Sequence, residues 1–195
     1  MSHYWALFRE INGQRFRFDT RIYLRPCDSP RRGDKACGRI IGKNPGSASP
    51  SEVRDELQSI ELQGDHFLPT VLSVARKAYR ARSTDCPDRT FIRVHNLFYL
   101  CDRDLREAKR ALRSVEHPPL CDTERLAVPW TWFAWGGPDP QLDVLKQRFI
   151  RKRSAHNFFY CGSAQRVEQR KPRLDDRARH TQGMPHAAVI AHLTK

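Results

Sequence analysis

Short apolar runs alternate with helical patterns along most of the chain. The runs typical of strands are 39–41, 90–98, 130–135 and 158–161. The segments with helical patterns are 50–57, 68–82, 102–116 and 140–149. Apolar side chains recur in the longer of these segments at three- and four-residue spacings, which predicts helices with one buried face. Because strands that alternate with helices pair in parallel through right-handed crossovers, this order predicts a three-layer α/β/α sandwich with a central parallel sheet of about four strands.

The residues before this region follow a different pattern. Residues 5–18 alternate in places around Asn12-Gly13, a dipeptide typical of the tight turn of a β-hairpin. Residues 21–24 add another extended piece. We therefore expect residues 1–37 to form an antiparallel hairpin or edge rather than a separate domain, so that residues 1–195 make a single domain.

A loop rich in Gly and Pro, Gly42-Lys43-Asn44-Pro45-Gly46, follows the first apolar run. Gly42 and Gly46 permit unusual dihedral angles and close approach of a ligand to the backbone, while Pro45 stiffens the turn. Asn44 is then an amide at the carboxyl end of a strand, where open α/β sheets bind their ligands. The alternative is an ordinary turn in which Asn44 serves only the backbone.

The chain carries a large excess of positive charge. Its 35 Lys and Arg residues outnumber 22 Asp and Glu residues, which gives a net charge of +13. This excess indicates a polyanionic partner, and the lack of a long apolar segment or a strongly amphipathic basic helix favours nucleic acid over a membrane. Segment 163–182 is too long for a simple turn, and we expect it to be a basic DNA-binding loop. Its candidate DNA-binding residues are Arg166, Arg170, Lys171, Arg173 and Arg177.

The six cysteines are scattered, and no two of them form a Cys-x-x-Cys pair. This spacing argues against a zinc ribbon or an iron–sulfur cluster. We expect reduced thiols in a cytoplasmic protein that uses no metal and no cofactor. A metal site made of Cys27, Cys37 and a distant His is the alternative.

Four short motifs, in the same order, resemble those of the uracil-DNA glycosylase superfamily, and the resemblance covers roughly residues 38–195. Gly42–Gly46 resembles the Gly-x-Asn-Pro-Gly motif of the mismatch-specific uracil/thymine branch. Val94–Phe98 resembles the strand ending in the Asn that reads the base, and Phe133–Gly136 resembles a strand that ends in Leu-Trp-Gly. Pro185-His186 stands where the family has its His-Pro-Ser loop. The chain departs from the family in having Asn44 in place of the Asp of the fastest branch and Ala187 in place of the Ser.

The resemblance implies a uracil-DNA glycosylase-like fold and a monomeric enzyme that flips a pyrimidine out of double-stranded DNA. Hydrolysis of the N-glycosidic bond then leaves an abasic site. The implied catalytic residues are Asn44 and His186, with Asp65 as a substitute base. The implied base-binding residues are Gly42, Lys43, Pro45, Gly46, Phe67, Asn96 and Trp135. Val189 is a candidate wedge for the vacated stack.

The resemblance also bears on the substrate, because Gly46 stands where the uracil-specific branch has a Tyr that blocks C5 of the pyrimidine. We therefore expect a C5-modified base, such as a hypermodified cytosine of phage DNA, and a role in defence. Repair of uracil or mismatched thymine is one alternative. A non-catalytic nucleic-acid-binding protein on the same scaffold is another, and a small-molecule nucleoside hydrolase is a third. Lyase activity is not expected, and Lys43 is the lysine with which to test this.

Overall fold

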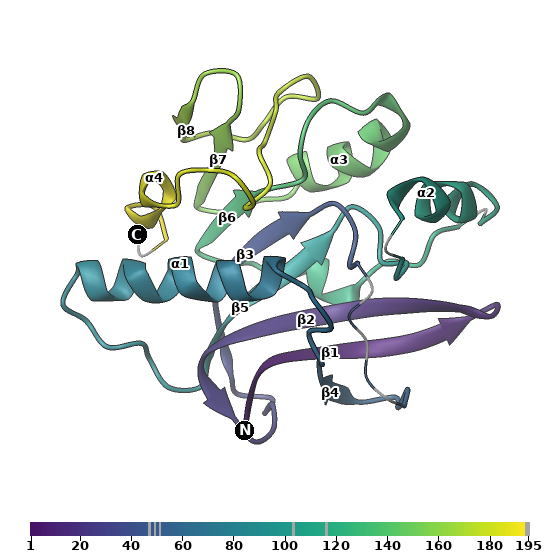
Figure 1. The fold of residues 1–195 in the computed structure, drawn as a ribbon, viewed down its shortest axis with the longest axis horizontal. Helices are drawn as coiled ribbons and strands as arrows, with labels where there is room; N and C mark the ends of the chain where they lie inside the picture. Colours follow the sequence, from purple (N-terminus) through teal and green to yellow (C-terminus); the bar gives the residue numbers. More distant parts are fainter. Residues whose placement is uncertain (47, 49, 51, 103, 116, 194–195) are drawn as a thin grey trace.

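The computed structural model describes the chain except for residues 47, 49, 51, 103, 116, 194 and 195, and one eight-stranded sheet runs through it (Figure 1). The strands are β1 (Ser2–Ile11), β2 (Gln14–Cys27), β3 (Lys35–Gly42), β4 (Leu57–Ser59), β5 (Thr90–Asn96), β6 (Trp130–Phe133), β7 (His156–Cys161) and β8 (Arg166–Glu168). The α-helices are α1 (Phe67–Ala81), α2 (Leu105–Arg113), α3 (Asp143–Ile150) and α4 (Ala187–Ile190). Two 3-10 turns are η1 (Asp122–Arg125) and η2 (Pro140–Leu142).

The sheet is mixed, with the strand order β4-β1-β2-β5-β3-β6-β7-β8. Its middle strands β5, β3, β6 and β7 pair in parallel. The other four pairings, β1 with β2, β1 with β4, β2 with β5 and β7 with β8, are antiparallel. The predicted three-layer sandwich around a four-stranded parallel sheet is therefore wrong, because antiparallel strands at both sides extend the sheet to eight strands.

The expected N-terminal hairpin is confirmed. Asn12 and Gly13 have φ values of +52° and +72°, the left-handed conformation that a tight hairpin turn requires. The sequence did not indicate how far the hairpin extends: β2 runs for 14 residues and pairs with β5, with Ile22 opposite Ile92. The hairpin is therefore part of the main sheet.

Two further predictions about local structure are wrong. The helix expected over 50–57 is absent from residues 52–56, and β4 begins at Leu57 (Ser51 lies outside the described residues). This stretch is mostly charged and has no apolar face to bury, and the Gln58 side chain binds its backbone at both Glu52 and Arg54 instead. The segment 163–182, expected to be a loop throughout, begins as a hairpin in which β8 pairs with β7.

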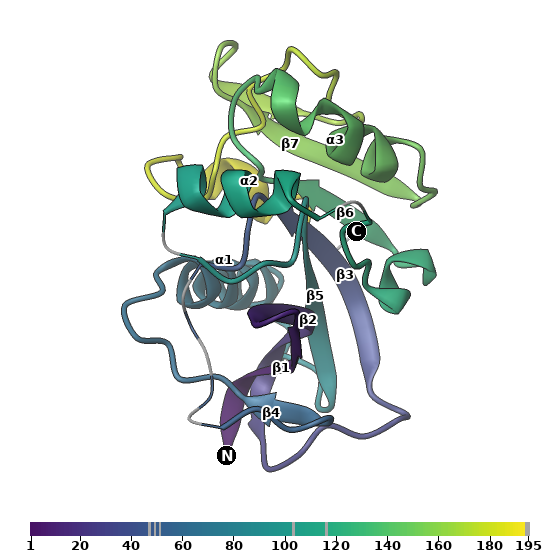
Figure 2. The same ribbon diagram turned by 90° about the vertical axis from the view of Figure 1, so that its right-hand side faces the viewer.

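Two buried clusters lie on opposite faces of the sheet, since side chains alternate along each strand. Ile40 and Phe158 belong to the cluster under α1 and α4, whereas Ile41 and Phe159 belong to the cluster that includes residues of α2 and α3. Figure 2 shows α1 against one side of the central strands. The middle strands are thus covered on both faces. A ligand site can therefore form only at their ends, and open sheets with parallel strands form it at the carboxyl ends.

The contact between Gly38 of β3 and Trp130 of β6 gives a test of this packing. A Cβ atom at Gly38 would lie 2.1 Å from the indole ring of Trp130, which is 2% exposed. Gly38→Ala should therefore lower the free energy of unfolding by about 1–3 kcal/mol, the usual cost of overpacking. Urea denaturation measures this loss, with Gly33→Ala as the control because a Cβ there meets nothing within 4 Å. Equal stability of the two variants would contradict the packing.

Candidate active site

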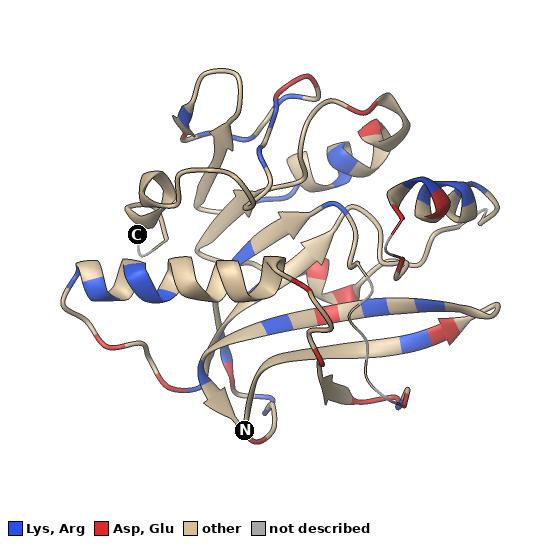
Figure 3. Cartoon of the chain, in the orientation of Figure 1, with Lys and Arg blue, Asp and Glu red and all other residues tan. Residues whose placement is uncertain are grey.

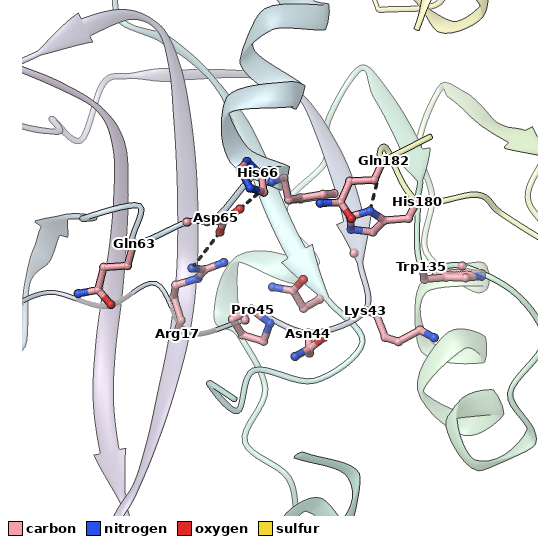
Figure 4. A pocket seen from close by; sticks show the side chains of 16 residues that line it. Arg17, Lys43, Asn44, Pro45, Gln63, Asp65, His66, Trp135, His180 and Gln182 are labelled. Carbon is pink, nitrogen blue, oxygen red and sulfur yellow. Dashed lines mark hydrogen bonds and ion pairs between the residues drawn. The ribbon is translucent and has the colours of Figure 1, made fainter. Parts of the chain in front are cut away.

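A pocket of about 710 Å³, here called the strand-end pocket, opens at the carboxyl ends of the parallel strands (Figure 4). Gly42 is the last residue of β3, Asn96 is the last residue of β5, and Trp135 follows β6. The other lining residues are Arg17, Lys43, Asn44, Pro45, Gly46, Gln63, Gly64, Asp65, His66, Phe67, Gly136, His180 and Gln182. Residues from the N-terminal hairpin, three parallel strands, the start of α1 and the C-terminal segment therefore meet in one place.

The strand-end pocket collects all but one of the residues predicted to be catalytic or to bind the base. Asn44, Asp65 and the seven predicted base-binding residues line it. His186 does not line it: its Nε2 atom lies 3.0 Å from the carbonyl oxygen of Thr181, and the residue directly precedes α4. His180, six residues earlier, lines the pocket in its place.

Asn96 is held close to the backbone of the neighbouring strand. A Cβ atom built at Gly42 would lie only 2.7 Å from Asn96 Oδ1, so the absence of a side chain at Gly42 makes room for the amide. Asn96 is 2% exposed, and among the described residues its Nδ2 has no hydrogen-bond partner. A buried donor left unpaired costs about 1–3 kcal/mol, which a ligand acceptor can relieve.

The side chain of Asn44 is fixed by one hydrogen bond. Its Nδ2 donates to the carbonyl oxygen of Asp102 at 2.9 Å, in the loop that follows β5. The amide oxygen is the acceptor end of the same group and can take a hydrogen bond from water. The amide of Asn44 thus ties the loop after β3 to the loop after β5.

Asp65 lies two residues before the start of helix α1. Its Oδ1 accepts hydrogen bonds from the backbone N–H groups of Phe67 at 2.7 Å and Leu68 at 3.2 Å, which stabilises the helix start. Its Oδ2 lies 3.9 Å from Nη1 of Arg17. One carboxylate oxygen is therefore committed to the helix, and the other faces a cation.

Arg17 is a site residue that no sequence pattern indicated. It lies on β2 and is 2% exposed, yet it lines the strand-end pocket. Its Nη1 donates to the carbonyl oxygen of Ala48 at 3.4 Å, while its Nε has no partner among the described residues. Burial lowers the pKa of its guanidinium, but arginine stays protonated in proteins and the group therefore keeps its charge.

His180 packs its ring against Phe67, with 4.9 Å between the ring centroids. Its Nδ1 accepts a hydrogen bond from the backbone N–H of Gln182 at 3.4 Å, so a neutral ring carries its proton on Nε2. Burial lowers the pKa of His180, nearby Asp65 opposes this effect, and Lys43 adds to it. The pocket therefore holds a neutral imidazole with one N–H donor.

Lys43 points toward the rim at Trp135 and Gly136 (Figure 4). Its Nζ lies 3.5 Å from the position that a Cβ of Gly136 would take. Burial is the main cause that lowers the pKa of the Lys43 ammonium; Lys109 and Lys146 lower it further, and Asp139 raises it. Trp135 beside it is 1% exposed and forms the floor of this side of the pocket.

The structure contradicts one of the predicted DNA-binding residues and shows the contacts of the others. Val189 cannot act as a wedge, because it is 0% exposed and belongs to the core under α1. Arg170 pairs with Asp176 at 2.6 Å, and Lys171 Nζ donates to the carbonyl oxygen of Lys152 at 2.7 Å, so both hold the segment together. Arg166 is exposed but pairs with Glu168 at 2.8 Å. Arg173 and Arg177 are exposed and remain candidates.

All six cysteines are free thiols, and burial raises the pKa of Cys37 to about 12. Within the described ranges, no group of three His, Cys, Asp or Glu side chains is arranged to hold a metal ion. The helices in the described part of the chain are all too short or too polar to cross a membrane.

Comparisons of the chain with protein-family models, curated proteins and solved structures found no match. The likeness to the uracil-DNA glycosylase superfamily therefore rests on the four short motifs.

Proposed function

We propose that the protein is a monofunctional DNA glycosylase that releases a pyrimidine from DNA. The observation that carries this proposal is the meeting of Asn44, Asn96 and His180 in the strand-end pocket. These three side chains offer an acceptor for water, a reader for the base edge and a donor for the departing base. N-glycosidic hydrolysis needs each of these, because positive charge develops on the sugar and negative charge on the base.

Base recognition falls to Asn96. Its amide presents one donor and one acceptor side by side, which matches the paired donor and acceptor on the edge of a pyrimidine. The unpaired, buried Nδ2 favours binding of a ligand that supplies an acceptor. A base can reach this depth only when it is extruded from the duplex.

Asn44 positions the attacking water. With its Nδ2 bound to Asp102, its Oδ1 can accept a hydrogen bond from a water directed at C1′ of the sugar. The water oxygen bonds to C1′, the C1′–N1 bond breaks, the electron pair leaves with the base, and a water proton passes to solvent or to the released base. Asp65 Oδ2 is the second candidate for the water contact.

His180 stabilises the leaving base. The Nε2–H of the neutral ring can donate to a base oxygen as that oxygen gains negative charge. A neutral donor can stabilise this charge through a hydrogen bond without transferring its proton. We therefore assign to His180 the catalytic role that the resemblance to the glycosylase motifs implied for His186.

The pH dependence of base release tests this role. Because the pKa of His180 lies below 6.5, the ring is already neutral at pH 7. The rate should stay level between about pH 8 and 7 and fall only at acidic pH, where protonation of Nδ1 removes the acceptor for the Gln182 N–H and releases the ring from its orientation. His180→Asn keeps a donor without a titrating group, so its smaller rate should lack this acidic decline. A rate that already falls between pH 8 and 7 would contradict the assignment.

The charge of the protein suits a DNA substrate. Figure 3 shows Lys and Arg on β2, α1, α2 and the C-terminal segment, rather than in the segment alone. Such a spread supports contacts with several phosphates. Double-stranded DNA, a monomeric state and a cytoplasmic location belong to the same proposal.

An alkali assay separates the proposal from its alternatives. Duplexes that carry candidate bases are incubated with the protein and then heated in alkali, which breaks strands at abasic sites. Breaks only after alkali support a glycosylase; binding without breaks supports a non-catalytic nucleic-acid-binding protein; and cleavage of free nucleosides supports a nucleoside hydrolase. Borohydride trapping that is lost in Lys43→Gln would instead favour a lyase.

We further propose that the released base is a pyrimidine modified at C5, as in hypermodified phage DNA. A Cβ built at Gly46 would meet nothing within 4 Å, and Gly46 has a φ of +71°, which other residues resist. The pocket volume of about 710 Å³ is in the range of sites that hold ligands larger than one ring. Matched duplexes with uracil, thymine opposite guanine, hydroxymethylcytosine or its glucosylated form distinguish the cases. Removal of uracil alone would favour repair.

A further inference from the structure

A second cavity of about 470 Å³, here called the arginine cavity, adjoins the strand-end pocket. The two share Gly136 and His180. Its other lining residues are Gly137, Gly162, Gln165, Arg177 and Arg179. Any ligand that fills both spaces must therefore pass the rim at Gly136 and His180.

The backbone around Arg177 and Arg179 is fixed between two strand ends. The N–H of Gly136 donates to the carbonyl oxygen of Ala178 at 2.7 Å, and the N–H of Gly162 donates to that of Arg177 at 2.9 Å. The N–H of Arg179 donates to Tyr160 at 2.9 Å. Ala178 is 0% exposed, so the two arginines on either side of it project together away from the core, as alternate residues of an extended chain do.

Arg177 lies across two glycines. A Cβ atom at Gly162 would lie 2.6 Å from Arg177 Cδ, and one at Gly137 would lie 3.4 Å from Arg177 Nε. Because Gly137 and Gly162 have no side chains, the side chain of Arg177 can lie along the cavity wall. This placement holds the charge of an exposed side chain at a defined position.

The two arginines are not neutralised within the protein. Among the described residues, no carboxylate forms an ion pair with Arg177 or Arg179, whereas Arg166 and Arg170 of the same segment pair with Glu168 and Asp176. Two guanidinium groups on one concave surface suit the oxygens of a phosphate, which they can bind through paired N–H donors.

We propose that the arginine cavity binds a DNA backbone phosphate next to the nucleotide whose base enters the strand-end pocket, with Arg177 and Arg179 as its ligands. This inference rests on the proposed function for the identity of that nucleotide. The reason for the assignment is that the two cavities share a rim. When the base of an extruded nucleotide enters the strand-end pocket, the backbone of that nucleotide must lie next to the pocket, where the arginine cavity opens.

The first test uses a duplex with one tetrahydrofuran abasic analogue, whose affinity is measured against salt concentration. Arg177→Gln and Arg179→Gln should each weaken binding and reduce the salt slope by about 1, the change expected for one lost phosphate contact. Arg54→Gln, outside both cavities and paired with Glu52, should leave the slope nearly unchanged. Equal slopes for all three variants and the unmodified protein would overturn the proposal.

The second test separates position from net charge. Gly162→Ala keeps every charge but adds a methyl group that displaces the Arg177 side chain from its position. The variant should therefore show the loss of affinity expected for Arg177→Gln. In a series of duplexes, one of the phosphates that flank the analogue is replaced at a time by a neutral methylphosphonate. At one position this replacement should weaken binding by the unmodified protein. At the same position it should have little further effect on binding by Arg177→Gln. Additive losses at every position would overturn the contact.

The two proposals can fail separately. Both affinity tests use DNA from which no base is released. If no base is excised but the slopes change as described, the phosphate site stands and the glycosylase does not. If bases are excised and the slopes remain the same, the glycosylase stands and the phosphate site does not.

Discussion

Asn44→Ala should reduce the single-turnover rate of base release by roughly 100-fold or more, because misplacing a reacting group by about 1 Å costs this much. The change removes the acceptor for water and also the 2.9 Å bond to Asp102 that ties two loops together. Quenched reactions followed by alkali treatment measure the rate, and thermal unfolding verifies that the variant is folded.

The control for this experiment is Asp65→Asn. Asparagine keeps the oxygen that caps α1 at Phe67 and Leu68 but removes the charge. If Asn44 positions the water, Asp65→Asn should retain most of the rate. If Asn44→Ala instead keeps most of the rate and Asp65→Asn loses it, Asp65 rather than Asn44 positions the water.

Gly42→Ala should reduce base release by roughly 10²–10³-fold, although the substitution adds only one methyl group. That methyl would lie 2.7 Å from Asn96 Oδ1, so the amide must leave the position in which it reads the base. Asn96→Ala removes the same amide directly. The double variant should therefore be no slower than either single variant, since both changes remove one interaction.

Gly33→Ala is the matched control, because a Cβ there meets nothing within 4 Å. Its rate should equal that of the unmodified protein. Multiplied losses in the Gly42→Ala, Asn96→Ala double variant would show that Gly42 acts on the reaction by another route and would contradict the proposed arrangement.

The sequence predicted local structure well. The runs 39–41, 90–98, 130–135 and 158–161 became β3, β5, β6 and β7, and the pattern over 68–82 became α1. Apolar periodicity and turn residues act over short distances, so these elements can be recognised without the rest of the chain. The same reasoning brought Asn44 and Asn96 to one edge of the sheet.

The helix expected over 50–57 failed for a local reason, whereas the errors in topology and in the site residues came from long-range pairing. No local pattern shows that β2 pairs with β5, and this pairing is what brings Arg17 to the strand-end pocket. The choice of His186 over His180 failed for a related reason. The path of segment 163–182 is set by its bonds to β6 and β7, and neither hydrophobic period nor turn chemistry encodes that path.

The ends of the sheet have a consequence for solubility. Its two outermost strands, β4 and β8, are each three residues long, so they present only a short ladder of unpaired N–H and C=O groups to another chain. β4 covers only Trp5 to Leu7 of β1, and the uncovered part of β1 includes the charged residues Arg9 and Glu10. Short edge strands and charges at an exposed edge both oppose edge-to-edge aggregation. Both edges of the eight-stranded sheet are therefore protected against pairing with the sheet edge of another copy.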